Sequence, residues 1–133
     1  MDRHEGFHRI AVSPAGARIR IELEGEPLAD SDRALVLREG SLPPRYYLPL
    51  DDVRTELLEP TDTTTTCPFK GDARYWSVRV GDDVHADLAW SYADPIEERR
   101  EIAGLVAFYD ERVDVLVDGV AQERPVTPWS PVA

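Results

Sequence analysis

The only cysteine and the only lysine of this 133-residue chain lie three positions apart, in Cys67-Pro68-Phe69-Lys70-Gly71. Proline and glycine favour a tight turn, which could present the thiol and the ammonium group to one pocket. A nearby cation favours the thiolate form of a thiol, which is the nucleophile. Cys67 and Lys70 are therefore candidate catalytic residues, although no histidine base lies close in the sequence. The alternative is that Cys67 is a small buried apolar residue and Lys70 an exposed turn residue.

Aromatic residues near this turn in the sequence indicate a second kind of site. Several of them could form the flat apolar walls of a cleft, in which Arg45 or Lys70 would bind a carboxylate or phosphate and Glu39 a hydroxyl or amine. The alternative is that the aromatic residues belong chiefly to the core. The candidate ligand-binding residues are Glu39, Arg45, Tyr46, Cys67, Lys70, Trp76, Trp90 and Tyr92.

The histidines give little support to a metal site. His4 and His8 have the spacing of a helical pair, but they lie in a weakly patterned terminus and no HExxH motif is present. His85 is expected in a strand, and a single cysteine excludes a zinc site built from several thiolates. We therefore expect no metal site, and the sequence identifies no cofactor.

Gly40-Ser41 followed by Asp51-Asp52 is similar to a nucleotidyltransferase pattern, in which a Gly-Ser turn holds phosphate and two carboxylates bind magnesium. In that pattern one residue separates the carboxylates, whereas here they are adjacent and would point to opposite faces of a strand. Asp51 and Asp52 are more simply interpreted as the capped start of a short helical turn.

Composition limits the classes of partner. The chain has 15 basic and 26 acidic residues, a net charge of −11, so nucleic acid and anionic membranes would be repelled overall. A length of 133 residues with 42% apolar content predicts one domain with a modest core. One cysteine cannot form an intramolecular disulfide, the first residues lack the apolar core of a signal peptide, and no apolar run approaches membrane-spanning length. These features predict the bacterial cytoplasm as the location.

Hydrophobic periodicity predicts mainly strands. Residues 18–24 alternate strictly between charged and apolar side chains, which is typical of a half-buried strand, and residues 34–38 and 45–48 predict two more. The clearest hairpin joins residues 75–80 to residues 84–90 across a three-residue loop, with Val80 opposite Val84. In this register Trp76, Val78, Val84 and Leu88 share one face, and Tyr75, His85 and Ala89 lie on the wetter one.

One helix is predicted from Asp94-Pro95-Ile96-Glu97, because Asp94 could cap free N–H groups, Pro95 suits the first helical position and Glu97 would complete a capping box. Apolar side chains follow at helical spacing and would form a stripe that is buried against the sheet: Ile102, Leu105, Val106, Tyr109 and Val113. A final strand is expected over residues 113–117.

The chain divides into three parts. Residues 1–16 have little pattern and are expected to be weakly ordered, residues 17–119 form the β-rich domain, and residues 120–133 are a proline-rich tail. Trp129 is the exception in this tail, and it is expected to contact the domain or a partner.

Six segments give a family resemblance that runs from about Arg18 to Val117. They are Ala29-Asp30-Ser31, Pro44 to Pro49 with Asp52-Val53, Cys67 to Gly71, Tyr75 to Val78, Ala89 to Tyr92 with Pro95-Ile96, and Ala107-Phe108-Tyr109. With these segments the chain resembles the bacterial family called domain of unknown function 427, which one classification labels nucleotidyltransferase-like. The resemblance implies a compact, mainly β (α+β) fold: a bent antiparallel sheet, or an open barrel of the tent kind, with one amphipathic helix packed on it. It brings no established catalytic residue, substrate or cofactor, and this chain has Thr66 where relatives often have an aromatic residue or histidine.

Three functions are compatible with these patterns. The leading hypothesis is a pocket near the Cys67–Gly71 turn that binds, and could act on, a small polar or anionic metabolite. The second is a protein-interaction or homo-oligomer module, which Trp129 and the proline-rich tail suggest. The third is magnesium-dependent nucleotidyl transfer, suggested by the family label and Gly40-Ser41.

Overall fold

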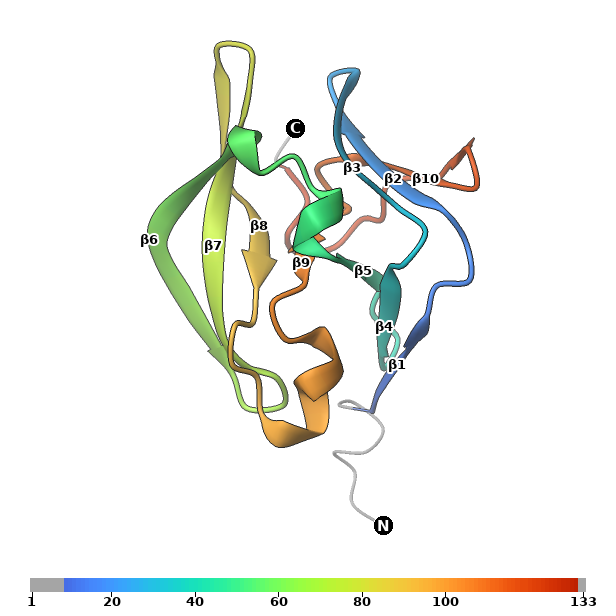
Figure 1. Ribbon diagram of the computed structural model, residues 1–133, viewed down its shortest axis with the longest axis vertical. Helices are drawn as coiled ribbons and strands as arrows, with labels where there is room; N and C mark the ends of the chain where they lie inside the picture. The colour runs from blue at the N-terminus through green and yellow to red at the C-terminus, as the bar shows by residue number, and fades with distance from the viewer. Residues whose placement is uncertain (1–8, 132–133) are drawn as a thin grey trace.

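The computed structural model describes residues 9–131, so the predicted His4–His8 pair lies outside the described residues. Two antiparallel sheets form a single small domain (Figure 1). The larger sheet has the strand order β1-β4-β5-β9-β8-β7-β6, and the smaller sheet has the order β11-β10-β2-β3. The strands are β1 (Ile10–Pro14), β2 (Ile19–Leu23), β3 (Glu26–Ser31), β4 (Leu35–Glu39), β5 (Arg45–Leu48), β6 (Leu58–Cys67), β7 (Gly71–Val80), β8 (Asp83–Ser91), β9 (Val106–Phe108), β10 (Asp114–Val117) and β11 (Val120–Ala121).

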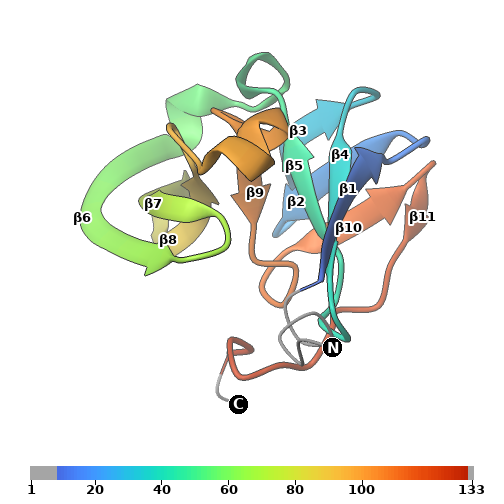
Figure 2. The same cartoon turned by 90° about the horizontal axis from the view of Figure 1, so that it is seen from below.

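The mainly β fold is confirmed. The seven-stranded sheet is strongly bent, with β1 and β6 at opposite ends (Figure 2), and the two sheets do not close into a barrel. The strands predicted near residues 18–24, 34–38, 45–48 and 113–117 are all present. Within the part of the chain that the structure describes, no helix has the length and apolar character needed to cross a membrane.

Each face of the seven-stranded sheet covers its own apolar cluster. The first cluster lies between the sheets, where Ile19 and Ile21 of β2 meet Val78, Leu88 and Phe108. The second cluster lies on the opposite face and contains Leu37, Tyr47, Ala73, Tyr75, Trp90, Tyr92, Ile102 and Ala107. Because strand residues alternate between faces, neighbouring residues of one strand contribute to different clusters.

The prediction of a long amphipathic helix is wrong. A 3₁₀ helix, η3 (Glu97–Ile102), replaces its first part, and β9 continues where the helix was expected. Gly104 has a φ of 73°, which interrupts helical geometry before Val106. Asp94 accepts a hydrogen bond from Arg100 instead of capping backbone N–H groups. The pairing of β9 with both β5 and β8 prevails over the local helical periodicity. Ile102, the first residue of the predicted apolar stripe, is nevertheless buried.

The β7–β8 hairpin is present, but its predicted register is wrong. Val80 pairs with Asp83 across a two-residue turn, in which Gly81 has a φ of 60°. Further along, Val78 pairs with His85 while Trp76 pairs with Ala89, so β8 contains extra residues there. Asp87 lies in this bulge with a φ of 50°. The bulge adds two residues and leaves the alternation of faces unchanged, so the two-residue turn sets Ala89 towards the core between the sheets and Trp90 towards the opposite face.

The segments next to the predicted domain also contain ordered strands. Residues 10–14 form β1, which pairs with β4, and residues 120–121 form β11, which pairs with β10. Trp129 lies against Arg45, whose guanidinium carbon is 5.8 Å from the centre of the indole ring.

Candidate ligand pocket

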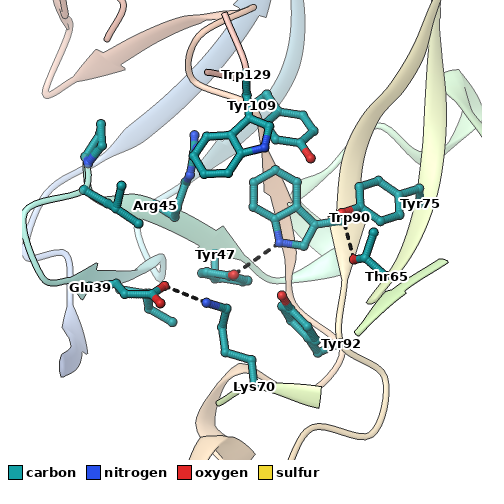
Figure 3. A pocket seen from close by; sticks show the side chains of 13 residues that line it. Glu39, Arg45, Tyr47, Thr65, Lys70, Tyr75, Trp90, Tyr92, Tyr109 and Trp129 are labelled. Atoms are coloured by element: carbon teal, nitrogen blue, oxygen red, sulfur yellow. Dashed lines mark hydrogen bonds and ion pairs between the residues drawn. The ribbon is translucent and has the colours of Figure 1, made fainter. Parts of the chain in front are cut away.

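An aromatic cavity of about 310 Å³ lies on the face of the seven-stranded sheet that points away from the smaller sheet (Figure 3). Side chains from β4, β5, β7 and β8 form its floor, and the Lys70 turn and the C-terminal segment form parts of its rim. The lining residues are Leu37, Glu39, Leu42, Pro43, Arg45, Tyr47, Thr65, Lys70, Tyr75, Trp90, Tyr92, Tyr109 and Trp129.

Arg45 is held in the wall of the pocket by a buried ion pair. Its guanidinium donates to both carboxylate oxygens of Glu111, at 2.6 and 2.8 Å, and the Glu111 side chain is fully buried. The Thr127 hydroxyl of the C-terminal segment donates to Glu111 Oε2 at 2.5 Å. Burial opposes ionisation of Glu111, but hydrogen bonds from Arg45 and Thr127 prevail and hold its pKa below the ordinary value.

Three aromatic rings surround the Arg45 guanidinium. Its central carbon lies 5.5 Å from the ring centre of Trp90, 5.6 Å from that of Tyr109 and 5.8 Å from that of Trp129. These distances are typical of cation–π contacts. The ion pair and the rings use the guanidinium fully, so Arg45 acts chiefly as a wall of the pocket.

Trp90 lies at the centre of the aromatic wall. Its indole N–H donates to the Tyr47 hydroxyl at 3.2 Å, and the two rings meet edge to face. The Tyr109 ring centre is 4.6 Å from that of Trp90. Burial raises the pKa of Tyr47, Tyr92 and Tyr109, so these phenols stay protonated and can donate at neutral pH.

The polar side of the pocket contains Lys70 and Glu39. The Lys70 ammonium donates to Glu39 Oε1 at 2.6 Å, and both side chains are mostly buried. An ammonium group has three N–H donors, so this ion pair leaves two for a ligand. The Tyr92 hydroxyl points towards the same space in Figure 3 and has no hydrogen-bond partner among residues 9–131.

The position of Lys70 depends on the contact between its turn and the following loop. The Lys70 N–H donates to the Cys67 carbonyl at 3.1 Å, and the Ile96 N–H donates to the Lys70 carbonyl at 2.9 Å. Gly71 has a φ of 127°, and a Cβ placed there would lie 3.1 Å from the Pro95 Cα. Glycine is therefore needed both for the backbone conformation and for the close approach.

Five of the eight candidate ligand-binding residues line the pocket: Glu39, Arg45, Lys70, Trp90 and Tyr92. The other three lie elsewhere. Tyr46 and Trp76 pack against the cluster between the sheets, and Cys67 is partly buried at the end of β6, outside the pocket lining. A catalytic role for Cys67 stays a prediction, and its thiol does not share this cavity with Lys70.

The candidate ligand-binding residues left out several lining residues, of which Tyr47 and Tyr75 are the clearest cases. Strand alternation was the available signal, because Arg45 and Tyr47 must share a face of β5 while Tyr46 takes the other. The same rule separates Tyr75 from Trp76 on β7. Glu111 and Thr127 gave no comparable signal, since they reach Arg45 only through tertiary contacts.

A group of possible metal ligands lies away from the pocket. One ligand atom each from Glu24, Asp83 and His85 falls within 4.8 Å of the others, at the tips of the β2–β3 and β7–β8 hairpins. His85 Nε2 is 2.9 Å from a Glu24 oxygen, so an exposed hydrogen-bonded pair accounts for the arrangement.

The residues of the nucleotidyltransferase-like pattern do not form part of the pocket lining. Gly40 and Ser41 follow β4, whereas Asp51 and Asp52 belong to the 3₁₀ helix η1 (Leu50–Asp52). The Asp52 carboxylate accepts hydrogen bonds from the Ser31 hydroxyl at 2.6 Å and from the Arg33 guanidinium at 3.1 Å.

The fold and the cavity define a small, mainly β protein with an aromatic pocket on one face of a bent antiparallel sheet. A family model described as "Domain of unknown function (DUF427)", whose label is that of a nucleotidyltransferase family, matches residues 11–119. The chain belongs to this family, as the resemblance predicted. The comparison with curated proteins gave no match.

Proposed function

We propose that the aromatic pocket binds a small, flat ligand rich in oxygen acceptors, such as a polar or anionic metabolite. The observation that carries this proposal is the convergence of free donors in one cavity: two N–H groups of Lys70 and the Tyr92 hydroxyl. Tyr47 adds a further donor, because its oxygen accepts from Trp90 and leaves its own proton available.

The free donors support an oxygen-rich ligand over a cationic one. Glu111 balances the charge of Arg45, and Lys70 keeps two N–H donors beside its ion pair with Glu39. The surrounding rings of Tyr47, Trp90 and Tyr109 provide flat surfaces for stacking, and a cavity of this size is typical of small-molecule sites. We place the protein in the cytoplasm, where such metabolites are available.

Thermal unfolding in the presence of planar carboxylates, nucleotides and sugar phosphates tests this proposal. A ligand at about 100 times its dissociation constant adds roughly 2.7 kcal/mol to the free energy of unfolding. We expect planar carboxylates to raise the melting temperature of the wild type, and Lys70→Ala or Tyr92→Phe to reduce the shift. Cys67→Ala is the matched control and should keep it. The absence of any shift, or an unchanged shift in Lys70→Ala, would contradict the proposal.

The alternative is a protein-interaction or homo-oligomer module, which the apolar rim of the pocket supports. Leu42 and Trp129 both line the pocket, yet they are 45% and 47% exposed, and Val126 nearby in the sequence is 92% exposed. Large exposed apolar side chains of this kind occur at protein interfaces. Light scattering distinguishes the two functions. A wild-type dimer that dissociates in Trp129→Ala favours the interaction module. A protein that stays monomeric over a wide concentration range contradicts the interaction module.

A further inference from the structure

A second cavity, of about 180 Å³, lies next to the first and is lined by side chains of β5, β10 and the C-terminal segment. Tyr46 of β5 lines it, on the opposite side of the strand from Arg45 and Tyr47. The complete lining is Pro43, Pro44, Tyr46, Asp110, Val113, Val115, Gln122, Glu123, Arg124 and Pro125.

Asp110 is an unusual residue to find in this lining. It is only 8% exposed, and among residues 9–131 none donates a hydrogen bond to its carboxyl group or forms an ion pair with it. The charge of Arg45 acts on Asp110, but Glu111 already binds that guanidinium through both oxygens. A buried carboxylate without a partner is costly, so such groups are normally paired.

Burial raises the pKa of Asp110 to about 7, with the nearby Glu111 charge acting in the same direction and Arg45 against it. The same surroundings raise the pKa of Tyr46, through burial and then through the charge of Asp110. Tyr46 therefore stays a neutral phenol beside the carboxyl group.

The other ionisable residues of the lining do not supply a counter-charge. Arg124 is ion-paired with Asp114, at 3.1 Å, and Glu123 adds a second negative charge. Prolines, valines and Gln122 form the remaining walls, and the Gln122 amide donates to the Val120 carbonyl at 2.9 Å. A metal ion is a poor match, because hard cations require several oxygen ligands and Asp110 is the only buried carboxylate in this lining.

We propose that this second cavity binds a small organic ammonium ion, which donates N–H groups to the Asp110 carboxylate and places its apolar part against Val113, Val115 and the prolines. The site is independent of the aromatic pocket, because it lies on the other side of β5 and selects the opposite charge.

Titration of the ¹⁵N-labelled full chain with benzylammonium and with the smaller isobutylammonium, followed by amide chemical shifts, tests this site. We expect at least one of the two ions to shift the amides of Tyr46, Asp110, Val113 and Val115 in a saturable way. Benzyl alcohol has nearly the same shape without the charge, and its affinity from the same titration should be at least about tenfold lower.

Two variants separate this site from the aromatic pocket. Asp110→Asn keeps the shape of the side chain and should weaken ammonium binding at least about tenfold, since the ion loses its charged partner. Lys70→Ala should leave ammonium binding unchanged. The proposal is overturned if neither ammonium ion shifts these amides, if benzyl alcohol binds as tightly, or if Asp110→Asn binds as the wild type does.

Discussion

Arg45 shows how a charged residue can form the wall of a cavity while other protein groups balance its charge. Its side chain is 13% exposed, and the Glu111 side chain opposite is fully buried. A buried ion pair gains stability only when its hydrogen bonds are satisfied, which Thr127 and the bidentate geometry accomplish here. The pair fixes the guanidinium between Trp90, Tyr109 and Trp129, and so holds one wall of the pocket in place.

Replacing Arg45 with methionine should destabilise the protein by about 3–5 kcal/mol, because Glu111 is left buried without its charge partner. The double variant Arg45→Met/Glu111→Leu should recover part of this loss, since no buried charge remains. Chemical denaturation at pH 7 measures both. Equal stability of the single variant and the wild type would show that Glu111 is not the buried partner of Arg45.

Asp110 should make stability depend on pH in the direction opposite to a paired carboxylate. Burial raises its folded-state pKa from 3.8 to about 7, so the folded state binds a proton that the unfolded state has released. The free energy of unfolding should therefore fall as pH rises from about 4 to 7 and stay low above that range.

The Asp110→Asn variant should gain stability over the wild type at pH 8 and show little difference at pH 4. Because each pKa unit corresponds to about 1.4 kcal/mol, the upper limit of this gain is roughly 4 kcal/mol. Denaturant unfolding of both proteins at several pH values provides the measurement. A gain in the free energy of unfolding that does not change with pH would show that packing causes it, and not the ionisation of Asp110.

At the scale of single elements, the Cys67–Gly71 turn places Lys70 by contacting the loop before η3. Gly71→Ala should destabilise the protein by about 1–3 kcal/mol, because alanine rarely adopts a φ of 127° and its Cβ would meet Pro95 at 3.1 Å. Gly81→Ala is the matched control, since Gly81 also has a positive φ but nothing lies within 4 Å of a Cβ there. The difference between the two melting temperatures reports the contact with Pro95 together with the stricter backbone requirement at Gly71, and equal losses would count against both.

The bulge in β8 lies close to Trp90, which lines the pocket. The Asp87 carboxylate accepts hydrogen bonds from the Thr61 and Thr63 hydroxyls, both at 2.7 Å, which attaches the bulge to β6. Asp87→Ala should cost about 1–3 kcal/mol, through these bonds and the less favourable left-handed backbone. Tryptophan fluorescence should change along with stability, whereas the exposed Asp82→Ala control should alter neither. Unchanged fluorescence in Asp87→Ala would show that the bulge does not fix the position of Trp90.

At the scale of the whole molecule, the C-terminal segment joins the aromatic pocket to the body of the domain. Thr127 donates to the buried Glu111, and Trp129 covers Arg45 at the pocket rim. Residues more than fifteen positions apart in the chain therefore build one wall.

Trp129→Ala should lower the free energy of unfolding by about 0.5–1 kcal/mol, as expected for an exposed cation–π contact, and should weaken any ligand that shifts the melting temperature. Val126→Ala is the control in the same segment, because Val126 is almost fully exposed and should change neither quantity. Identical behaviour of the two variants would mean that Trp129 does not contribute to the pocket wall.

Local patterns predicted much of the sheet. The alternation at Ile19, Ile21 and Leu23 matches the buried face of β2, and the residues between Tyr75 and Trp90 do form a hairpin. Turn chemistry and alternation are properties of neighbouring residues, so they can be read without knowing the fold. The helical stripe from Ile102 to Val113 failed because β9 gains partners on both sides, which no local pattern reveals.

The amino-acid sequence by itself determined that this is a mainly β domain of its family, and it identified Glu39, Arg45, Lys70, Trp90 and Tyr92 as residues of interest. The tertiary structure alone decided which of their neighbours join them. Val80 pairs with Asp83, one residue earlier than predicted, so Trp90 and not Ala89 shares a face with Tyr75. The physical reason is that a register shift of one residue turns every side chain of a strand to the other face, and only pairing with the neighbouring strand fixes the register.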